Sequence, residues 1–206
     1  MLSEEDSLPV NSVRLSDLKA ELLVAAMETE KNGLCRHKTG NLSVINREEG
    51  YIVITPSGIS KEKLEMSDFI VCDLNGEVLK NPMDHKPSIE TEMHLACYRK
   101  RPDIESVVHT HSTFASVFAV NGREIPPVLS EAAFYNNNTK IVPFAEPGSH
   151  ELAANAEQAL DQDTDVLLLQ KHGVLVVGNK IADTLLKAAY VEEVAKVACF
   201  SELMNK

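Results

Sequence analysis

The chain has 206 residues, 44% of them hydrophobic, and a formal net charge of −11 at pH 7. This length suits a single domain over residues 1–206 that buries roughly 70% of its unfolded surface, so no disulfide framework is required. The negative charge argues against nucleic acid or an anionic membrane as a partner, because binding to either depends on basic patches.

Cysteine usage and the N-terminal segment indicate a cytoplasmic protein. The four cysteines lack Cys-x-x-Cys spacing, which favours free thiols in a reducing compartment. The first 20 residues carry acidic residues rather than a basic signal region, and no apolar run approaches the ~20 residues of a membrane span. We expect residues 1–11 to form a loose arm, with no membrane segment after them.

The first half of the chain predicts a helix, two hairpins and a second helix. Ser16 is expected to cap a helix that ends near Asn32, because apolar residues follow it at helical spacing. Ser88 is expected to start a helix that continues through Lys100 and is stopped by Pro102. Apolar runs between turn residues predict strands at 41–45, 51–55, 69–73 and 77–79.

The second half of the chain predicts strands and helices in a less regular order. A short strand at 104–108 runs into His109, and apolar runs at 166–170 and 174–177 predict a hairpin with His172 at its tip. Gly173 would permit a positive φ if that turn needs one. The other predicted elements are helices at 112–120, 151–160 and 181–203, and a strand at 139–144.

This order predicts an α/β fold, a three-layer α/β/α domain with a largely antiparallel central sheet. Strict strand-helix-strand alternation is absent, which argues against a doubly wound parallel sheet. The glycines do not form GxGxxG and no Walker loop occurs, so a nucleotide site has no support.

Three histidines at strand ends predict a metal site. His109 and His111 are two residues apart on an extended chain, so their side chains point to the same face. His172 adds a third imidazole from another strand end. Neutral imidazoles held by rigid backbone are good ligands for a divalent metal, and three protein ligands leave an open position.

Several turn segments could hold an anion or be ordinary structural features. Ser88 and Glu90 stand at a predicted helix start, where free NH groups favour an anion, but a cap with a dipole-compensating acid is the commoner use. Gly40-Asn41 and Ser57-Gly58 are turn residues by default. The residues alone leave both interpretations open.

Five ordered motifs resemble the class II aldolase/adducin family. The likeness extends from about residue 15 to 204, and five motifs in order are more specific than any one. The motifs are Gly40-Asn41-Leu42-Ser43, Ile54-Thr55-Pro56-Ser57-Gly58, Ser88-Ile89-Glu90 with His94-Leu95-Ala96-Cys97-Tyr98, Arg101-Pro102 with Val107-Val108-His109-Thr110-His111-Ser112, and Lys171-His172-Gly173.

The resemblance implies a C4 homotetramer and a role for each matching residue. His109, His111 and His172 would hold a zinc ion, and Glu90 would be the acid-base carboxylate. The implied phosphate pocket consists of Gly40, Asn41, Ser57, Gly58 and Ser88. The implied reaction is the reversible cleavage of a phosphorylated ketose, L-fuculose 1-phosphate or a similar sugar, to dihydroxyacetone phosphate and an aldehyde such as L-lactaldehyde.

Some positions depart from the family pattern and keep alternatives open. Ile89 stands where family enzymes often have a hydroxyl, and Ser130 stands where the fuculose enzymes have a tyrosine that handles the aldehyde oxygen. A dehydratase or a decarboxylase of the same family therefore stays open. A 4-epimerase is disfavoured, because Phe134 falls near the position of its catalytic aspartate.

A noncatalytic, adducin-like interaction protein is also disfavoured. It would keep three imidazoles and Glu90 without an ion, and burying unpaired polar groups is costly. His94 lies four residues after Glu90, on the same helical face. We expect it to pack behind the site rather than bind metal.

Overall fold

The computed structural model describes residues 12–204, and the predicted arm at 1–11 lies outside them. Eight strands form one sheet in the order β4-β3-β2-β1-β5-β8-β7-β6. Their bounds are β1 Asn41–Asn46, β2 Tyr51–Ile54, β3 Ile70–Asp73, β4 Val78–Lys80, β5 Ser106–Thr110, β6 Lys140–Val142, β7 Val166–Leu169 and β8 Gly173–Gly178.

The sheet is mixed, whereas the sequence predicted a largely antiparallel one. Neighbouring strands run antiparallel except for β6 and β7, which are parallel. A parallel pair needs a crossover connection, and the helix α4 (His150–Ala159) supplies it between β6 and β7. The chain thus contains one strand-helix-strand unit that the pattern analysis missed.

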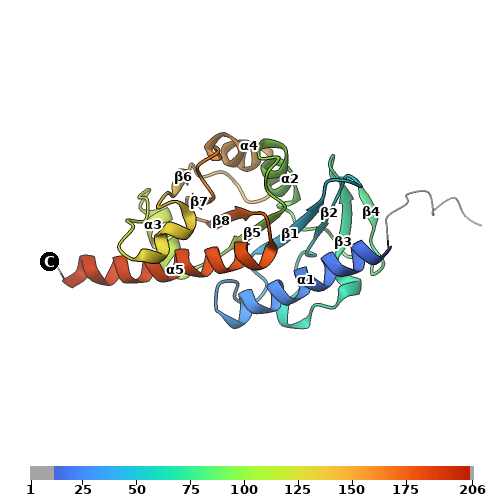
Figure 1. Ribbon diagram of the computed structural model, residues 1–206, viewed down its shortest axis with the longest axis horizontal. Helices are drawn as coiled ribbons and strands as arrows, with labels where there is room; N and C mark the ends of the chain where they lie inside the picture. The colour runs from blue at the N-terminus through green and yellow to red at the C-terminus, as the bar shows by residue number, and fades with distance from the viewer. Residues whose placement is uncertain (1–11, 205–206) are drawn as a thin grey trace, which may run out of the picture.

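Helices cover both faces of the sheet (Figure 1). The helices α1 (Ser12–Lys31), α3 (Thr113–Val120) and α5 (Ile181–Met204) pack on one face, while α2 (Thr91–Lys100) and α4 pack on the other. Strand residues alternate between the two resulting cores, as Val108 and Val107 of β5 do. Burial on both faces explains why most strands read as continuous apolar runs.

Two helix starts differ from the prediction. The helix α1 begins at Ser12, so Ser16 lies inside it rather than at its cap. The helix α2 begins at Thr91, with Glu90 at its N-cap position, so the predicted start at Ser88 is wrong. Residues 88–90 instead form a turn in which the amide NH of Glu90 donates to the hydroxyl of Ser88 (3.3 Å).

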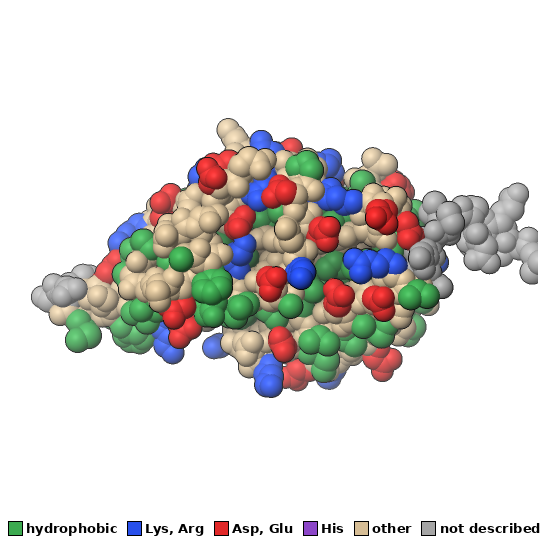
Figure 2. All heavy atoms as spheres, in the orientation of Figure 1, with side chains coloured by type: hydrophobic (Ala, Val, Ile, Leu, Met, Phe, Trp, Pro, Cys, Tyr) green, Lys and Arg blue, Asp and Glu red, His purple; other side chains and the backbone are tan. Residues whose placement is uncertain are grey.

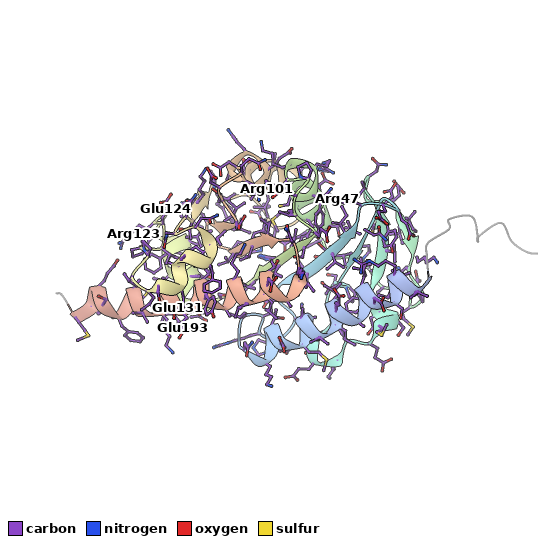
Figure 3. The ribbon with its side chains drawn as sticks, in the orientation of Figure 1. Arg47, Arg101, Arg123, Glu124, Glu131 and Glu193 are labelled. Carbon is purple, nitrogen blue, oxygen red and sulfur yellow. The ribbon has the colours of Figure 1, made fainter. Side chains whose placement is uncertain are left out.

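Arg47 fixes the end of α2 against the hairpin of β1 and β2. Its guanidinium donates to the carbonyl oxygens of Tyr98 (3.3 Å), Arg101 (3.0 Å) and Ile104 (2.8 Å). Arg47 and Arg101 are labelled in Figure 3. Because α2 carries Glu90 at its other end, this anchor helps to hold that carboxylate over the sheet.

The face formed by α1 and α5 is mixed in charge. Figure 2 shows acidic and basic side chains interspersed on it, with hydrophobic side chains along its lower part. Phe200, Leu203 and Met204 are exposed at the free end of α5. Within residues 12–204, no helix combines the length and the apolar character needed to cross a membrane.

Candidate metal centre

Three histidines meet at one end of the sheet because β5 and β8 are antiparallel neighbours. Thr110, the last residue of β5, pairs with Val174 near the start of β8. His109 and His111 therefore lie beside His172, which immediately precedes β8. The ring centroids are 4.8 to 5.1 Å apart, and one nitrogen from each ring lies within 4.8 Å of the other two.

The imidazoles turn ring nitrogens toward a shared space. Nδ1 of His109 lies 3.0 Å from the carbonyl oxygen of Val174, which can only accept, so Nδ1 donates there and Nε2 is the nitrogen that faces the shared space. That Nε2 lies 3.1 Å from Nε2 of His111. Burial, followed by the neighbouring imidazoles, lowers the pKa of His111 to about 3 and that of His172 to about 4. Neutral rings of this kind suit a divalent cation.

The carboxylate of Glu90 faces the same space. Its Oε1 lies 3.1 Å from Nε2 of His172, and its Oε2 lies 3.2 Å from Nε2 of His109. Glu90 is only 4% exposed, yet Oε1 has no hydrogen-bond partner among the described residues. A buried carboxylate oxygen without a partner is costly. A cation between the carboxylate and the imidazoles would satisfy all four groups, so the residues fit a divalent metal.

The surroundings of Glu90 favour its ionised form. Burial alone would raise the pKa of this carboxyl group, but the imidazoles of His109 and His172 and the amide of Asn41 outweigh it. The net pKa lies below the usual range for glutamate. Glu90 is therefore available as a base at neutral pH.

A cavity of about 410 Å³ opens beside the histidines and contains all five residues predicted for the phosphate pocket. Glu90, His111 and His172 also line it. A bridge between Pro56 and Pro87 brings the turn at Ser57-Gly58 close to the turn at residues 88–90. The five residues are Gly40, Asn41, Ser57, Gly58 and Ser88.

Some predicted positions lie apart from the cavity wall. His109 is fully buried behind it. Ser130 is exposed at the start of the short helix η3 (Ser130–Tyr135) and does not line the cavity. Ile89 does line the cavity and is 63% exposed.

The two glycines nearest the histidines are required by close contacts. A Cβ on Gly173 would lie 2.2 Å from the carbonyl oxygen of Thr110. The positive φ of this turn falls on Lys171 (55°) and not on Gly173, where glycine is needed for space. Gly40 has a φ of +70°, and a Cβ there would lie 2.4 Å from Sγ of Cys35.

Sequence reasoning assigned no role to three lysines near the cavity. Lys38 and Lys171 line it, and Lys171 directly precedes His172. Lys61 is buried and donates to the carbonyl oxygens of Thr39 (2.9 Å) and Gly40 (2.6 Å). Lys38 could have been noticed because it lies only two residues before Gly40. The burial of Lys61 could not, because it depends on how the segment around Lys61 packs in the folded chain.

Comparison with known families and proteins gives a consistent result. A family model described as "Class II Aldolase and Adducin N-terminal domain" matches residues 20–199. A curated protein from Bacillus thuringiensis serovar kurstaki, 5-deoxy-D-ribulose 1-phosphate aldolase, is 34% identical over 179 residues. This match covers 87% of the present chain and 83% of that protein.

Solved structures agree with the sequence comparisons. An L-fuculose 1-phosphate aldolase is similar with a TM-score of 0.85 and 31% identity, covering 93% of this chain and 89% of that one. An L-fuculose-1-phosphate aldolase from Thermus thermophilus has a TM-score of 0.80 at 23% identity, covering 91% and 95%. The second likeness supports the fold alone.

Proposed function

Because this chain belongs to the class II aldolase and adducin family, we propose that it is a metal-dependent aldolase that reversibly cleaves a ketose 1-phosphate. The products are dihydroxyacetone phosphate and an aldehyde. One observation carries the proposal: three imidazoles, a buried carboxylate and the five turn residues meet around one cavity.

His109, His111 and His172 are the metal ligands in this proposal, and zinc is the metal. Neutral imidazoles from three positions are typical of catalytic zinc sites, which keep a position open for substrate. Bound there, the metal would stabilise the negative charge that develops on the ketone oxygen when the carbon-carbon bond breaks.

Glu90 moves the proton at carbon. In cleavage it gives a proton to the carbon that loses the aldehyde fragment, and in condensation it removes that proton. Its lowered pKa supports the base role in the direction of condensation. Its exposure of only 4% limits competition from bulk water as a proton donor.

The turns at Gly40-Asn41, Ser57-Gly58 and Ser88 bind the substrate phosphate. Backbone NH groups and hydroxyls can hold a phosphate against an unfavourable overall charge. Lys38 and Lys171, which line the same cavity, favour a dianion there. With the phosphate fixed, the ketone end of the sugar extends toward the histidines.

The substrate is L-fuculose 1-phosphate or a similar ketose 1-phosphate. Two relatives above 30% identity are described as aldolases for L-fuculose 1-phosphate and 5-deoxy-D-ribulose 1-phosphate. Both sugars carry their phosphate on carbon 1, which matches a cavity with one anion-binding end.

Release of dihydroxyacetone phosphate tests the proposal. Purified protein is treated with a chelator, restored with zinc, and assayed on both sugar phosphates with an NADH-coupled reaction. We expect release that depends on zinc. A zinc-loaded protein that cleaves neither sugar contradicts the aldolase proposal, and product analysis for water or carbon dioxide loss then identifies the dehydratase or decarboxylase alternative.

We also propose that the protein assembles as a homotetramer. The exposed apolar residues at the free end of α5 support an interface between copies. Light scattering after gel filtration measures the mass directly. A monomeric mass at micromolar concentration would contradict this part of the proposal.

A further inference from the structure

A line of buried polar side chains leads away from Glu90 into the core under α2. Nδ2 of Asn41 lies 2.8 Å from Oε2 of Glu90, and Oδ1 of Asn41 lies 2.6 Å from Nε2 of His94. Nδ1 of His94 lies 2.7 Å from the hydroxyl of Ser43, which lies 2.8 Å from the hydroxyl of Tyr98. All five side chains are buried, and His94 is completely so.

The chemistry of the partners fixes the direction of each hydrogen bond. The Glu90 carboxylate only accepts, so Asn41 must turn its NH2 group toward it and its carbonyl oxygen toward His94. Nε2 of His94 therefore carries a proton. Burial lowers the pKa of His94 to about 3, so the ring is neutral and Nδ1 accepts from Ser43. Ser43 in turn accepts from Tyr98.

Packing alone does not fix the orientation of the Asn41 amide, because a flipped amide fills the same space. The flip would set its carbonyl oxygen against the Glu90 carboxylate, which is repulsive. The Nε2-H of His94, accepted by Oδ1, and the Glu90 carboxylate, which accepts from Nδ2, both favour the observed orientation. His94 thus holds the far end of the amide whose NH2 group meets Glu90.

We propose that His94 is a positioning residue for Glu90, acting through the side chain of Asn41. The inference rests on the proposed aldolase function and adds a residue that touches neither substrate nor metal. It assigns the side chain of Asn41 first to Glu90 and only secondarily to the phosphate. A displaced Glu90 is expected to slow proton transfer on the order of 10-fold to 100-fold.

Two substitutions at His94 separate positioning from packing. His94→Leu removes the donor to Asn41, whereas His94→Gln keeps an NH2 group that reaches the same amide oxygen. We expect kcat to fall at least about 10-fold in the leucine variant, with KM within about threefold, and to recover within about threefold of wild type in the glutamine variant. A folded leucine variant with wild-type kcat would overturn the proposal.

Should His94→Leu fail to fold, Ser43→Ala tests the same line with a smaller change. Ser106→Ala is its matched control, because Ser106 is an equally buried serine on the adjacent strand β5, bonded to Thr184 instead. We expect kcat to fall in Ser43→Ala but not in Ser106→Ala. Equal kcat values in the two folded variants would count against the line of hydrogen bonds.

A double-mutant cycle asks whether His94 acts through Glu90. In the Glu90→Gln background the carboxylate is already lost, so adding His94→Leu should change kcat by less than about twofold. A further loss as large as in the wild-type background would show that His94 acts independently of Glu90, and the proposal would be wrong.

A spectroscopic test does not depend on turnover. The Glu90 oxygens lie 3.1 and 3.2 Å from two imidazole nitrogens, so a displaced carboxylate should change the visible absorption of Co²⁺ bound to the histidines. We expect the His94→Leu spectrum to resemble that of Glu90→Gln, and the His94→Gln spectrum to resemble wild type. A wild-type spectrum in His94→Leu would contradict this inference. If the spectra are as expected but the protein cleaves no ketose 1-phosphate, only the proposed function is wrong.

Discussion

At the scale of single residues, the candidate metal centre depends on how closely two strand ends approach. Gly173 lets the start of β8 pass the carbonyl oxygen of Thr110 at a distance that no side chain allows. Cε1 of His109 would also lie 3.2 Å from an added Cβ. The glycine therefore sets how closely His109 and His172 approach each other.

Gly173→Ala should weaken metal binding and cost about 1–3 kcal/mol of unfolding free energy, because the backbones of β5 and β8 must move apart. Gly50→Ala is the control for metal content, since an added Cβ there meets nothing within 4 Å and its φ of +71° costs stability far from the histidines. Urea unfolding and elemental analysis measure both effects. Full zinc occupancy in Gly173→Ala would contradict this explanation.

His109→Ala should abolish both metal content and turnover. His109 is the fully buried member of the three, and it contacts both the other histidines and Glu90. Two remaining imidazoles bind a divalent metal much more weakly than three. Elemental analysis of protein purified without chelators gives the metal content, and stoichiometric zinc with normal turnover would refute the ligand assignment.

At the scale of elements, α5 holds the helix that follows His111. Both carboxylate oxygens of Glu192 accept backbone NH groups at the start of α3, from Phe114 (3.0 Å) and Ala115 (2.9 Å). A helix start leaves such NH groups without partners, and the hydroxyl of Ser112 at the N-cap does not satisfy them. A distant helix thus supplies the cap.

Glu192→Ala should lower the unfolding free energy by about 1–2 kcal/mol, because it leaves two partly buried NH groups unpaired. Glu193→Ala is the matched control, since Glu193 is the exposed neighbour on the same helix (Figure 3). Chemical denaturation of both variants measures their unfolding free energies. Equal stability of the two variants would show that the cap contributes little.

At the scale of the whole molecule, buried neutral histidines link stability to pH. The pKa of His94 in the folded protein is lowered by burial to about 3, below the ordinary value of 6.5. As pH falls, the unfolded chain takes up this proton first. The stability from the neutral ring is therefore complete above about pH 6.5 and is lost as pH falls toward 3.

The metal-free protein should accordingly lose up to about 1.4 kcal/mol per pH unit below pH 6.5 from His94 alone. His94→Gln should show a shallower loss, and subtracting the two curves removes the contributions of His111 and His172. Denaturant unfolding of chelator-treated protein between pH 7.5 and 4.5 measures both. Parallel curves would mean that His94 is not a neutral buried ring in the folded state.

The sequence by itself determined the features that local pattern encodes. The strand pairs β1-β2, β3-β4 and β7-β8 lie within a residue or two of their predicted bounds. Apolar runs and turn residues are local signals, so the sequence alone locates them. The family prediction is confirmed by the match to residues 20–199. The three histidines were found because each stands at the end of a recognisable strand.

Tertiary structure decided what depends on pairing between distant segments. The register that sets Asn41 opposite His109 also brings Asn41 between Glu90 and His94, and no local pattern contains that information. The parallel β6-β7 pair, the burial of Lys61 and the need for glycine at position 173 have the same origin. A side chain's neighbours across a sheet follow from strand order and register, which only the folded chain specifies.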